Sequence, residues 1–225
     1  MSLSRPWDDF DAYLFDIDGT LIHCADAVHY FAFCDVLSSV GGRPLNLEGV
    51  TTHGNTDVGI LRDAFATAGI AEGNWRYRLS ELRERLCLRV EEQKGNLCVK
   101  VLPQVQEVLS HLRRKGAILS IATGNLERVG KQKLAAAGIL DQFDMGTWSD
   151  AFEYRVDVFR YAVEQIRRNT RRGATVLAIG DTPADIIAAK SNHVPVIAVA
   201  TGVYTYDQLI AHEPSLCIHS MADLL

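Results

Sequence analysis

The chain has 225 residues, of which 48% are hydrophobic and 23% are charged, and its formal net charge at pH 7 is −5. This is the balance of an ordinary globular protein that is large enough to bury a core without disulfides. An acidic chain of this kind is not expected to bind nucleic acid through a general basic surface.

Further features argue against a membrane or secreted protein. The longest apolar stretches, around residues 117–122 and 194–200, are far shorter than a membrane span. The N-terminal segment carries acidic residues by position 8 and has no apolar signal-peptide core. The five cysteines are odd in number and form no CxxC pair, which is typical of a reducing compartment. We therefore expect a cytoplasmic protein without a membrane partner, whose oligomeric state the sequence does not indicate.

Short apolar runs followed by glycine, aspartate or threonine recur along the chain and predict buried strands. They cover residues 12–15, 117–122, 175–179 and 196–200, with weaker candidates at 143–146 and 216–218. Segments with helical periodicity lie between them, at residues 105–115, 126–137, 156–168 and 184–191. Because strands that alternate with helices pair in parallel, we expect an α/β fold with a Rossmann-like, doubly wound parallel sheet.

One stretch, from about residue 25 to residue 98, breaks this alternation. It contains helical patterns at residues 56–68 and 74–92 and no convincing strand. The simplest interpretation is an all-helical domain inserted after the first strand. We therefore predict a core domain formed by residues 1–24 and 99–225, and an inserted helical domain formed by residues 25–98.

Polar residues follow three of the predicted strands at their carboxyl ends. These segments are Asp16-Ile17-Asp18-Gly19-Thr20, Thr123-Gly124-Asn125 and Gly180-Asp181-Thr182-Pro183-Ala184-Asp185. In an open parallel sheet, ligands bind beyond the carboxyl ends of the strands, so we expect the three segments to converge. Their convergence would place four carboxylates in one crevice: those of Asp16, Asp18, Asp181 and Asp185.

The cost of such a cluster indicates its purpose. Two carboxylates about 4 Å apart repel each other by roughly 4 kcal/mol at an effective dielectric constant near 20. Four together need a cation or must bind protons. Oxygen ligands without histidine or cysteine suit Mg²⁺, and a Mg²⁺ with open positions attracts phosphate oxygens. Each segment alone is also compatible with a turn or a helix cap, so the prediction depends on all three meeting.

These segments resemble the motifs of the haloacid dehalogenase superfamily of hydrolases, and the resemblance covers nearly the whole chain. Phe15–Leu21 is similar to the first motif, the unit from Val101 to Asn125 ends in the second, and Gly180–Asp185 is similar to the fourth. The helical insert is similar to the C1-type cap of phosphoglycolate phosphatase-like and β-phosphoglucomutase-like members. Such motifs are specific for the superfamily and poor guides to substrate.

The resemblance implies a set of catalytic and metal-binding roles. Asp16 would attack phosphorus and form an aspartyl-phosphate. Asp18 would protonate the leaving oxygen and then activate water. Mg²⁺ would be held by the carboxylates of Asp16 and Asp181 and by the main-chain oxygen of Asp18. Asp185 would act as a ligand through water or as an anchor for the other ligands.

The second motif would bind the phosphoryl group. The Thr123 hydroxyl and nearby main-chain N–H groups would contact the phosphoryl oxygens, with Gly124 and Asn125 as substrate-binding residues. Such groups supply the positioning and charge stabilisation that phosphoryl transfer needs.

The chain departs from the family at the third motif, which usually provides a lysine ahead of a helix. If Asp157 aligns with the aspartate of that motif, the lysine position falls on Glu153. Arg155 is the nearest cation and the expected substitute, since a guanidinium can bind carboxylate or phosphate through two bonds. The alternative is that Arg155 only pairs with a surface acid.

The cap would choose the substrate through the loop at residues 52–57. Gly54 and Thr56 are the expected contacts to the leaving group. An equally weighted alternative is that Asn55 or Thr56 only caps the following helix and does not contact the substrate. His53 is interpreted as a solvated loop residue, because Asp18 already fills the acid–base role.

We therefore predict a Mg²⁺-dependent phosphatase that acts on a small phosphorylated metabolite. The aspartate at position 18 argues against dehalogenase chemistry, because dehalogenases that resemble this pattern lack it. One alternative is a hexose phosphomutase similar to β-phosphoglucomutase. The other is a non-catalytic, phosphate-binding regulatory protein, whose only support is the missing lysine of the third motif.

Overall fold

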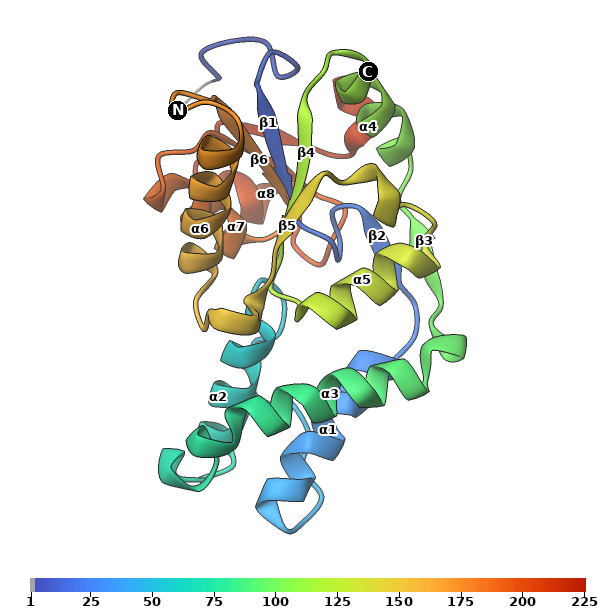
Figure 1. The fold of residues 1–225 in the computed structure, drawn as a ribbon, viewed down its shortest axis with the longest axis vertical. Helices are drawn as coiled ribbons and strands as arrows, with labels where there is room; N and C mark the ends of the chain where they lie inside the picture. Colours follow the sequence, from blue (N-terminus) through green and yellow to red (C-terminus); the bar gives the residue numbers. More distant parts are fainter. Residues whose placement is uncertain (1–2) are drawn as a thin grey trace.

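The computed structural model describes residues 3–225, so the first two residues of the predicted core domain lie outside the described part. Its centre is a six-stranded sheet in the order β5-β4-β1-β6-β7-β8, in which neighbouring strands run parallel. Helices cover both faces of the sheet (Figure 1), as expected for a doubly wound α/β fold. The strands are β1 (Ala12–Phe15), β4 (Ile118–Ala122), β5 (Met145–Thr147), β6 (Val176–Gly180), β7 (Val196–Val199) and β8 (Leu216–Ile218).

Two hydrophobic clusters, one on each face, hold the helices to the sheet. Side chains of a strand alternate between its faces, so Tyr13 and Phe15 of β1 join one cluster while Ala12 and Leu14 join the other. The first cluster includes the apolar stripe of α4, and the second includes those of α6 and α7. The helices are α4 (Val105–Arg114), α5 (Glu127–Ala136), α6 (Arg155–Asn169), α7 (Pro183–Ser191) and α8 (Tyr206–Ile210).

The structure differs from the predicted elements in several places. No predicted segment covers α8, and the helical pattern predicted at 74–92 becomes an α-helix only at Leu79. β5 begins two residues later than the predicted run at 143–146, because a short 3-10 turn at Leu140–Gln142 precedes it. β2 (Ile22–Cys24) and β3 (Val99–Val101) form an antiparallel pair that the sequence analysis does not predict. Strands of three residues are too short to show a periodic pattern. The helix α1 (Val28–Gly41) is likewise not singled out in the sequence analysis.

Three helices lie between β2 and β3 and occupy the lower part of Figure 1: α1, α2 (Asp57–Thr67) and α3 (Leu79–Glu92). They share a hydrophobic cluster in which the rings of Phe65 and Trp75 stack with their centroids 5.1 Å apart. Leu126 and Val129, at the start of α5, belong to the same cluster, so these helices pack directly on the part that carries the sheet. We keep the division into two domains as a prediction and call residues 25–98 the cap.

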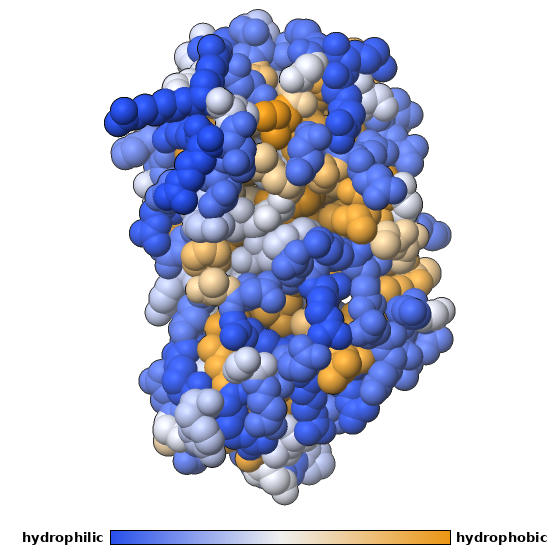
Figure 2. Space-filling view, viewed as in Figure 1, coloured by the Kyte–Doolittle hydropathy of each residue, from blue (hydrophilic) through white to orange (hydrophobic). Residues whose placement is uncertain are grey.

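The longest helices of the described chain are short compared with a membrane span. Hydrophilic residues dominate the face shown in Figure 2. The helix α6 has 15 residues, and α1 and α3 have 14 each. Among residues 3–225, none of the helices combines the length and the apolar character that crossing a membrane requires.

Candidate active site

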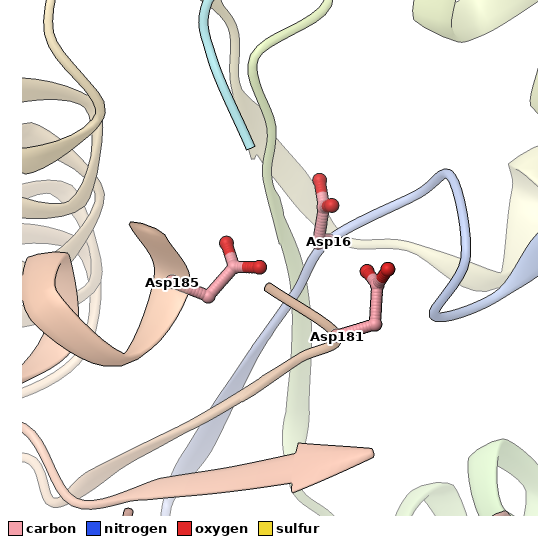
Figure 3. Close-up of side chains that lie close together, drawn as sticks. All are labelled: Asp16, Asp181 and Asp185. Atoms are coloured by element: carbon pink, nitrogen blue, oxygen red, sulfur yellow. The ribbon is translucent and has the colours of Figure 1, made fainter. Parts of the chain in front are cut away.

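Three buried carboxylates meet where the strands of the sheet end. Asp16 directly follows β1, Asp181 directly follows β6, and Asp185 lies in the first turn of α7. One carboxylate oxygen from each lies within 4.8 Å of the other two (Figure 3). The structure therefore brings three of the four expected carboxylates into one close cluster, and Asp18 lines the same cavity but lies outside this cluster.

Two glycines make room for Asp181. A Cβ atom at Gly202 would lie 1.8 Å from Asp181 Oδ2, and one at Gly19 would lie 2.3 Å from the same oxygen. Gly19 also has a φ of +82°, a conformation that residues with a side chain rarely adopt. The Thr20 hydroxyl donates a hydrogen bond to Asp181 Oδ1 over 2.9 Å. The loops after β1 and β7 therefore fix the position of this carboxylate.

Asp185 uses both of its carboxylate oxygens within the protein. Its Oδ2 accepts hydrogen bonds from the main-chain N–H of Thr182 (3.1 Å) and from the Thr182 hydroxyl (2.7 Å), within a capping box at the start of α7. Its Oδ1 accepts from Nε (3.0 Å) and an η-nitrogen (2.6 Å) of Arg155. This arrangement suits an anchoring residue better than a direct metal ligand.

Arg155 lies between two of the carboxylates. One η-nitrogen of its buried guanidinium is 2.7 Å from Asp16 Oδ1 and 2.6 Å from Asp185 Oδ1. Glu153, on which the lysine position falls if Asp157 aligns with the aspartate of the third motif, instead forms ion pairs with Arg62 and Arg76 of the cap. The structure thus places the arginine of this segment beside Asp16. Because Arg155 is buried, the alternative that it only pairs with a surface acid is excluded.

The electrostatics of the cluster favour a cation. Burial raises the pKa of Asp16 to about 6 despite the opposing charge of Arg155, and the neighbouring Asp185 carboxylate adds to the rise. Burial, together with the charges of Asp16 and Asp185, raises the pKa of Asp181 well above its usual value. A hard divalent ion would offset this repulsion, and the all-oxygen donor set fits Mg²⁺.

Asp18 turns away from the cluster toward a lysine. Its two carboxylate oxygens accept hydrogen bonds from Lys133 Nζ over 2.9 and 2.8 Å, and Oδ2 also accepts from the Asn125 amide over 2.8 Å. Enclosure between cap and core acts to raise the pKa of Asp18, but Lys133 and Asn125 outweigh it and lower the pKa to about 2. Asp18 is therefore ionised in this arrangement.

Lys133 is a candidate site residue that the sequence analysis misses. It lies in α5 and its side chain is only 6% exposed. The sequence does contain a signal, because Lys133 follows Leu126 and Val129 at helical spacing and so falls on the apolar stripe of the predicted helix. A lysine at such a position is rarely buried unless a carboxylate faces it.

The second-motif loop connects this site to the cap. The buried Thr123 hydroxyl oxygen accepts a hydrogen bond from the Asn125 amide over 2.9 Å. The main-chain oxygen of Gly124 accepts from the N–H of Asp57 in the cap over 2.7 Å. A Cβ atom at Gly124 would lie 2.1 Å from the main-chain oxygen of Asn55, so the close approach of the cap requires glycine here.

The two residues predicted to contact the leaving group differ in their placement. Gly54 lines the cavity beside Thr182, where a Cβ atom would lie 2.7 Å from the Thr182 hydroxyl. Thr56 does not line it. Its buried hydroxyl caps α2 by accepting from Gly59 N–H and donates to the main-chain oxygen of Glu153 over 2.7 Å. A helix cap and a cap–core contact therefore use the hydroxyl of Thr56, as in the alternative stated for it from the sequence.

A cavity of about 420 Å³ opens between cap and core above these groups. Its lining residues from the core include Asp16, Asp18, Thr123, Lys133, Arg155 and Asp181. Its lining residues from the cap include His29, Tyr30, Phe33, Leu47, Asp57 and Ile60. A small ligand in this cavity would touch both parts of the chain at once.

A sequence model described as haloacid dehalogenase-like hydrolase matches residues 13–199. The chain belongs to the haloacid dehalogenase-like hydrolase family. This membership agrees with the resemblance of the three motif segments, each of which lies inside the matched range.

Individual curated relatives share about 30% of their residues with this chain over the aligned part. The "Probable phosphatase IndB" of Dickeya dadantii is 30% identical over 150 residues, which cover 63% of this chain and 65% of that protein. A "Phosphoglycolate phosphatase" of Cereibacter sphaeroides is 29% identical over 143 residues, covering 63% and 64%. The chain therefore spans slightly less than two thirds of these relatives. The crystal structure of a hydrolase from Pseudomonas syringae has the same fold, with a TM-score of 0.67, 20% identity and 93% of each chain covered.

Proposed function

We propose that this family member is a Mg²⁺-dependent phosphatase that hydrolyses a small phosphorylated metabolite through an aspartyl-phosphate. The observation that carries the proposal is the position of Asp16, at the end of β1 between Arg155 and Asp181 and open to the cavity. The names of the two curated relatives support phosphatase activity, and one of them makes 2-phosphoglycolate a substrate to test.

The proposed reaction has two steps. The Asp16 carboxylate attacks phosphorus, the bond from phosphorus to the ester oxygen breaks, and a proton from Asp18 leaves with the alcohol. Asp18 then accepts a proton from a water molecule whose oxygen attacks phosphorus. The bond from phosphorus to Asp16 breaks, and inorganic phosphate leaves while both carboxyl groups return to their starting states.

The remaining site residues would position and neutralise the phosphoryl group. The Thr123 hydroxyl and the main chain at Gly124 and Asn125 would bind its oxygens, and Arg155 would hold Asp16 in place. A Mg²⁺ held by Asp16, Asp181 and the main-chain oxygen of Asp18 would supply the charge that offsets the carboxylates and the phosphoryl oxygens.

The proton-donor role sets a requirement on Asp18. In the structure Lys133 holds it as a carboxylate, which suits the second step but not the first. Asp18 must therefore separate from Lys133 and gain a proton when substrate enters. Lys133 lines the cavity, so its released ammonium group would then pair with the oxygens of the phosphoryl group.

The two alternatives, a non-catalytic phosphate-binding protein and a hexose phosphomutase, have less support than a phosphatase. The non-catalytic interpretation depended on the missing third-motif lysine, and Arg155 places a cation beside Asp16 in its stead. The hexose phosphomutase is not favoured, because the curated relatives carry phosphatase names.

The test is release of inorganic phosphate from an aryl phosphate in the presence of Mg²⁺. We expect turnover by the wild type and by Asp207→Asn, an exposed carboxyl on α8, and none by Asp16→Asn. Full activity of Asp16→Asn would remove Asp16 as nucleophile. Incubation with a hexose 1-phosphate separates the alternatives, because a mutase yields an isomerised sugar phosphate instead of free phosphate.

A further inference from the structure

We propose that the cavity selects phosphate esters whose leaving alcohol is uncharged and has a planar or apolar face, and that it discriminates against a leaving group that carries a carboxylate. This inference rests on the proposed phosphatase function and names its substrate class. It follows from the charge and the shape of the cavity wall beyond the phosphoryl site.

The cap side of the cavity is aromatic and aliphatic. Phe33 and Ile60 line it and are almost fully buried, at 3% and 5% exposure. The ring of Phe33 stacks on His29, with centroids 4.8 Å apart and an interplanar angle of 29°. Tyr30 and Leu47 extend this wall. A flat or apolar leaving group would cover these surfaces, which a small, strongly hydrated group would not.

The fixed positive charges of the cavity are already paired. Among residues 3–225, the lysine and arginine side chains that line it are Lys133 and Arg155. Lys133 Nζ lies 2.8 Å from Asp18 Oδ2. The guanidinium of Arg155 lies 2.7 Å from Asp16 and 2.6 Å from Asp185. Both cations also face the phosphoryl end of the cavity, so neither is free to bind a second anionic group.

A buried carboxylate lies at the cap end as well. Asp57 lines the cavity, is 3% exposed and accepts a hydrogen bond from Leu126 N–H over 2.8 Å. His29 Nε2 lies 3.3 Å from Asp57 Oδ2, so any positive charge on this imidazole faces an anion already. The other two imidazoles of the wall, those of His23 and His53, are exposed, and water screens them.

A carboxylate on the leaving group would therefore enter a wall that holds a fixed anion and lacks an uncommitted cation. Like charges placed together at a binding site are a common means of rejecting the wrong ligand. An uncharged hydroxyl or amide would meet no such penalty.

A matched pair of substrates tests the charge. We compare 2-phosphoglycolate with the phosphate ester of glycolamide, which has the same number of heavy atoms and no carboxylate. We expect kcat/KM for the amide to be higher by roughly 30- to 100-fold, the size of effect that a like-charge contact produces. A kcat/KM for 2-phosphoglycolate equal to or above that of the amide would overturn the inference.

A second pair tests the apolar wall. We expect 2-phenylethyl phosphate to have a KM about 10-fold below that of ethyl phosphate, because its ring would cover Phe33 and Ile60. Equal KM values would overturn this part of the inference. If none of the four esters releases phosphate with Mg²⁺ present, the proposed function itself fails, an outcome distinct from hydrolysis with the opposite preference.

A positive charge added to the wall should weaken the preference for the uncharged ester. Tyr30 lines the cavity from α1 and is 41% exposed, so Tyr30→Arg can be accommodated and supplies an unpaired cation. We expect it to raise kcat/KM for 2-phosphoglycolate relative to the amide by about 10-fold. The control is Phe31→Arg, the next residue of α1, which is 65% exposed and lies outside the cavity wall. The inference fails if both variants change the ratio equally or if neither does.

Discussion

Lys133 Nζ lies 2.8 Å from Asp18 Oδ2, and this ion pair joins helix α5 to the loop after β1 across 115 residues of sequence. The same ammonium group donates to Asn125 Oδ1 over 2.8 Å, so a single lysine holds two of the three motif loops. A buried ammonium is tolerated only with partners of this kind. Lys133 therefore fixes the position of the Asp18 carboxylate in the absence of substrate.

Replacing Lys133 by methionine keeps most of the volume of the side chain and removes its charge. The Asp18 side chain is 39% exposed, so water would solvate part of the carboxylate that is left behind. We expect a loss in the free energy of unfolding of about 1–3 kcal/mol, below the range for a fully buried pair. Denaturation by urea measures this loss.

The double variant Asp18→Asn, Lys133→Met is the control for direct coupling. Its destabilisation should fall short of the sum of the two single variants by about 0.5–3 kcal/mol, because the pair is already broken by either change. Additive effects would show that the two side chains do not stabilise each other. The kcat of Lys133→Met should also fall, since an unpaired Asp18 would lose its fixed position.

Arg155 is expected to matter for both folding and turnover. Its guanidinium and both partner carboxylates are almost fully buried, so Arg155→Ala should cost about 3–5 kcal/mol of stability. We expect kcat to fall by about 100- to 1000-fold, as when a group that stabilises the transition state is removed. Because the alanine variant is at risk of unfolding, Arg155→Lys provides a second measurement and should retain intermediate activity.

The matched control for Arg155 is Arg160→Ala on the same helix. The Arg160 side chain is 60% exposed, and its ion pair within residues 3–225 is with Asp157, three residues earlier. Its loss should leave steady-state kinetics unchanged. Wild-type turnover by Arg155→Ala would remove Arg155 from the proposed site.

Whether a site residue can be predicted from the sequence depends on whether the sheet topology or a distant side chain sets its position. Asp16 and Asp181 directly follow apolar strands, so the topology of a parallel sheet is enough to predict that they meet. The direction of the Asp18 side chain is not predictable in this way, because it depends on a lysine of a distant helix. Thr56 shows the same limit, since a helix cap and a substrate contact need the same residue type.

The short elements were missed for a different reason. β2 and β3 have three residues each, and their pairing brings together segments on either side of the cap. No periodicity exists over three residues, so only the contact between distant segments defines them. By contrast, β6 and β7 are apolar throughout and were predicted to within a residue at each end.

Gly202 should be essential for metal binding rather than for the fold. Its replacement by alanine would place a Cβ atom 1.8 Å from Asp181 Oδ2 and displace this carboxylate. We expect the Mg²⁺ concentration for half-maximal activity to rise at least about 10-fold, because one of few protein ligands is lost. Calorimetric titration of Mg²⁺ in the presence of phosphate gives the affinity directly.

The control for this change is Gly173→Ala. A Cβ atom at Gly173 meets no other atom within 4 Å, and the residue lies in the loop before β6, away from the cavity. Its Mg²⁺ dependence should match that of the wild type. An unchanged Mg²⁺ requirement in Gly202→Ala would contradict the assignment of Asp181 as a ligand.

A carboxylate remote from the cavity should make folding stability depend on pH. Asp11 accepts hydrogen bonds from Arg171 and from the main chain and hydroxyl of Thr175, and these lower its pKa from 3.8 to about 2. A folded-state pKa below that of the unfolded chain means that the ionised form stabilises the fold. This contribution is complete above about pH 4 and is lost as the pH falls toward 2.

We therefore expect Asp11→Asn to be less stable than the wild type between pH 5 and 7, by an amount that does not change across this range. The difference should shrink between about pH 4 and pH 2, where the wild-type carboxylate takes up its proton. Urea denaturation at a series of pH values measures the difference. In an Arg171→Ala background it should be smaller at every pH above 4, because Arg171 makes the largest contribution to lowering the pKa of Asp11. A difference that grows as the solution becomes acidic would have the wrong sign and would refute the assignment.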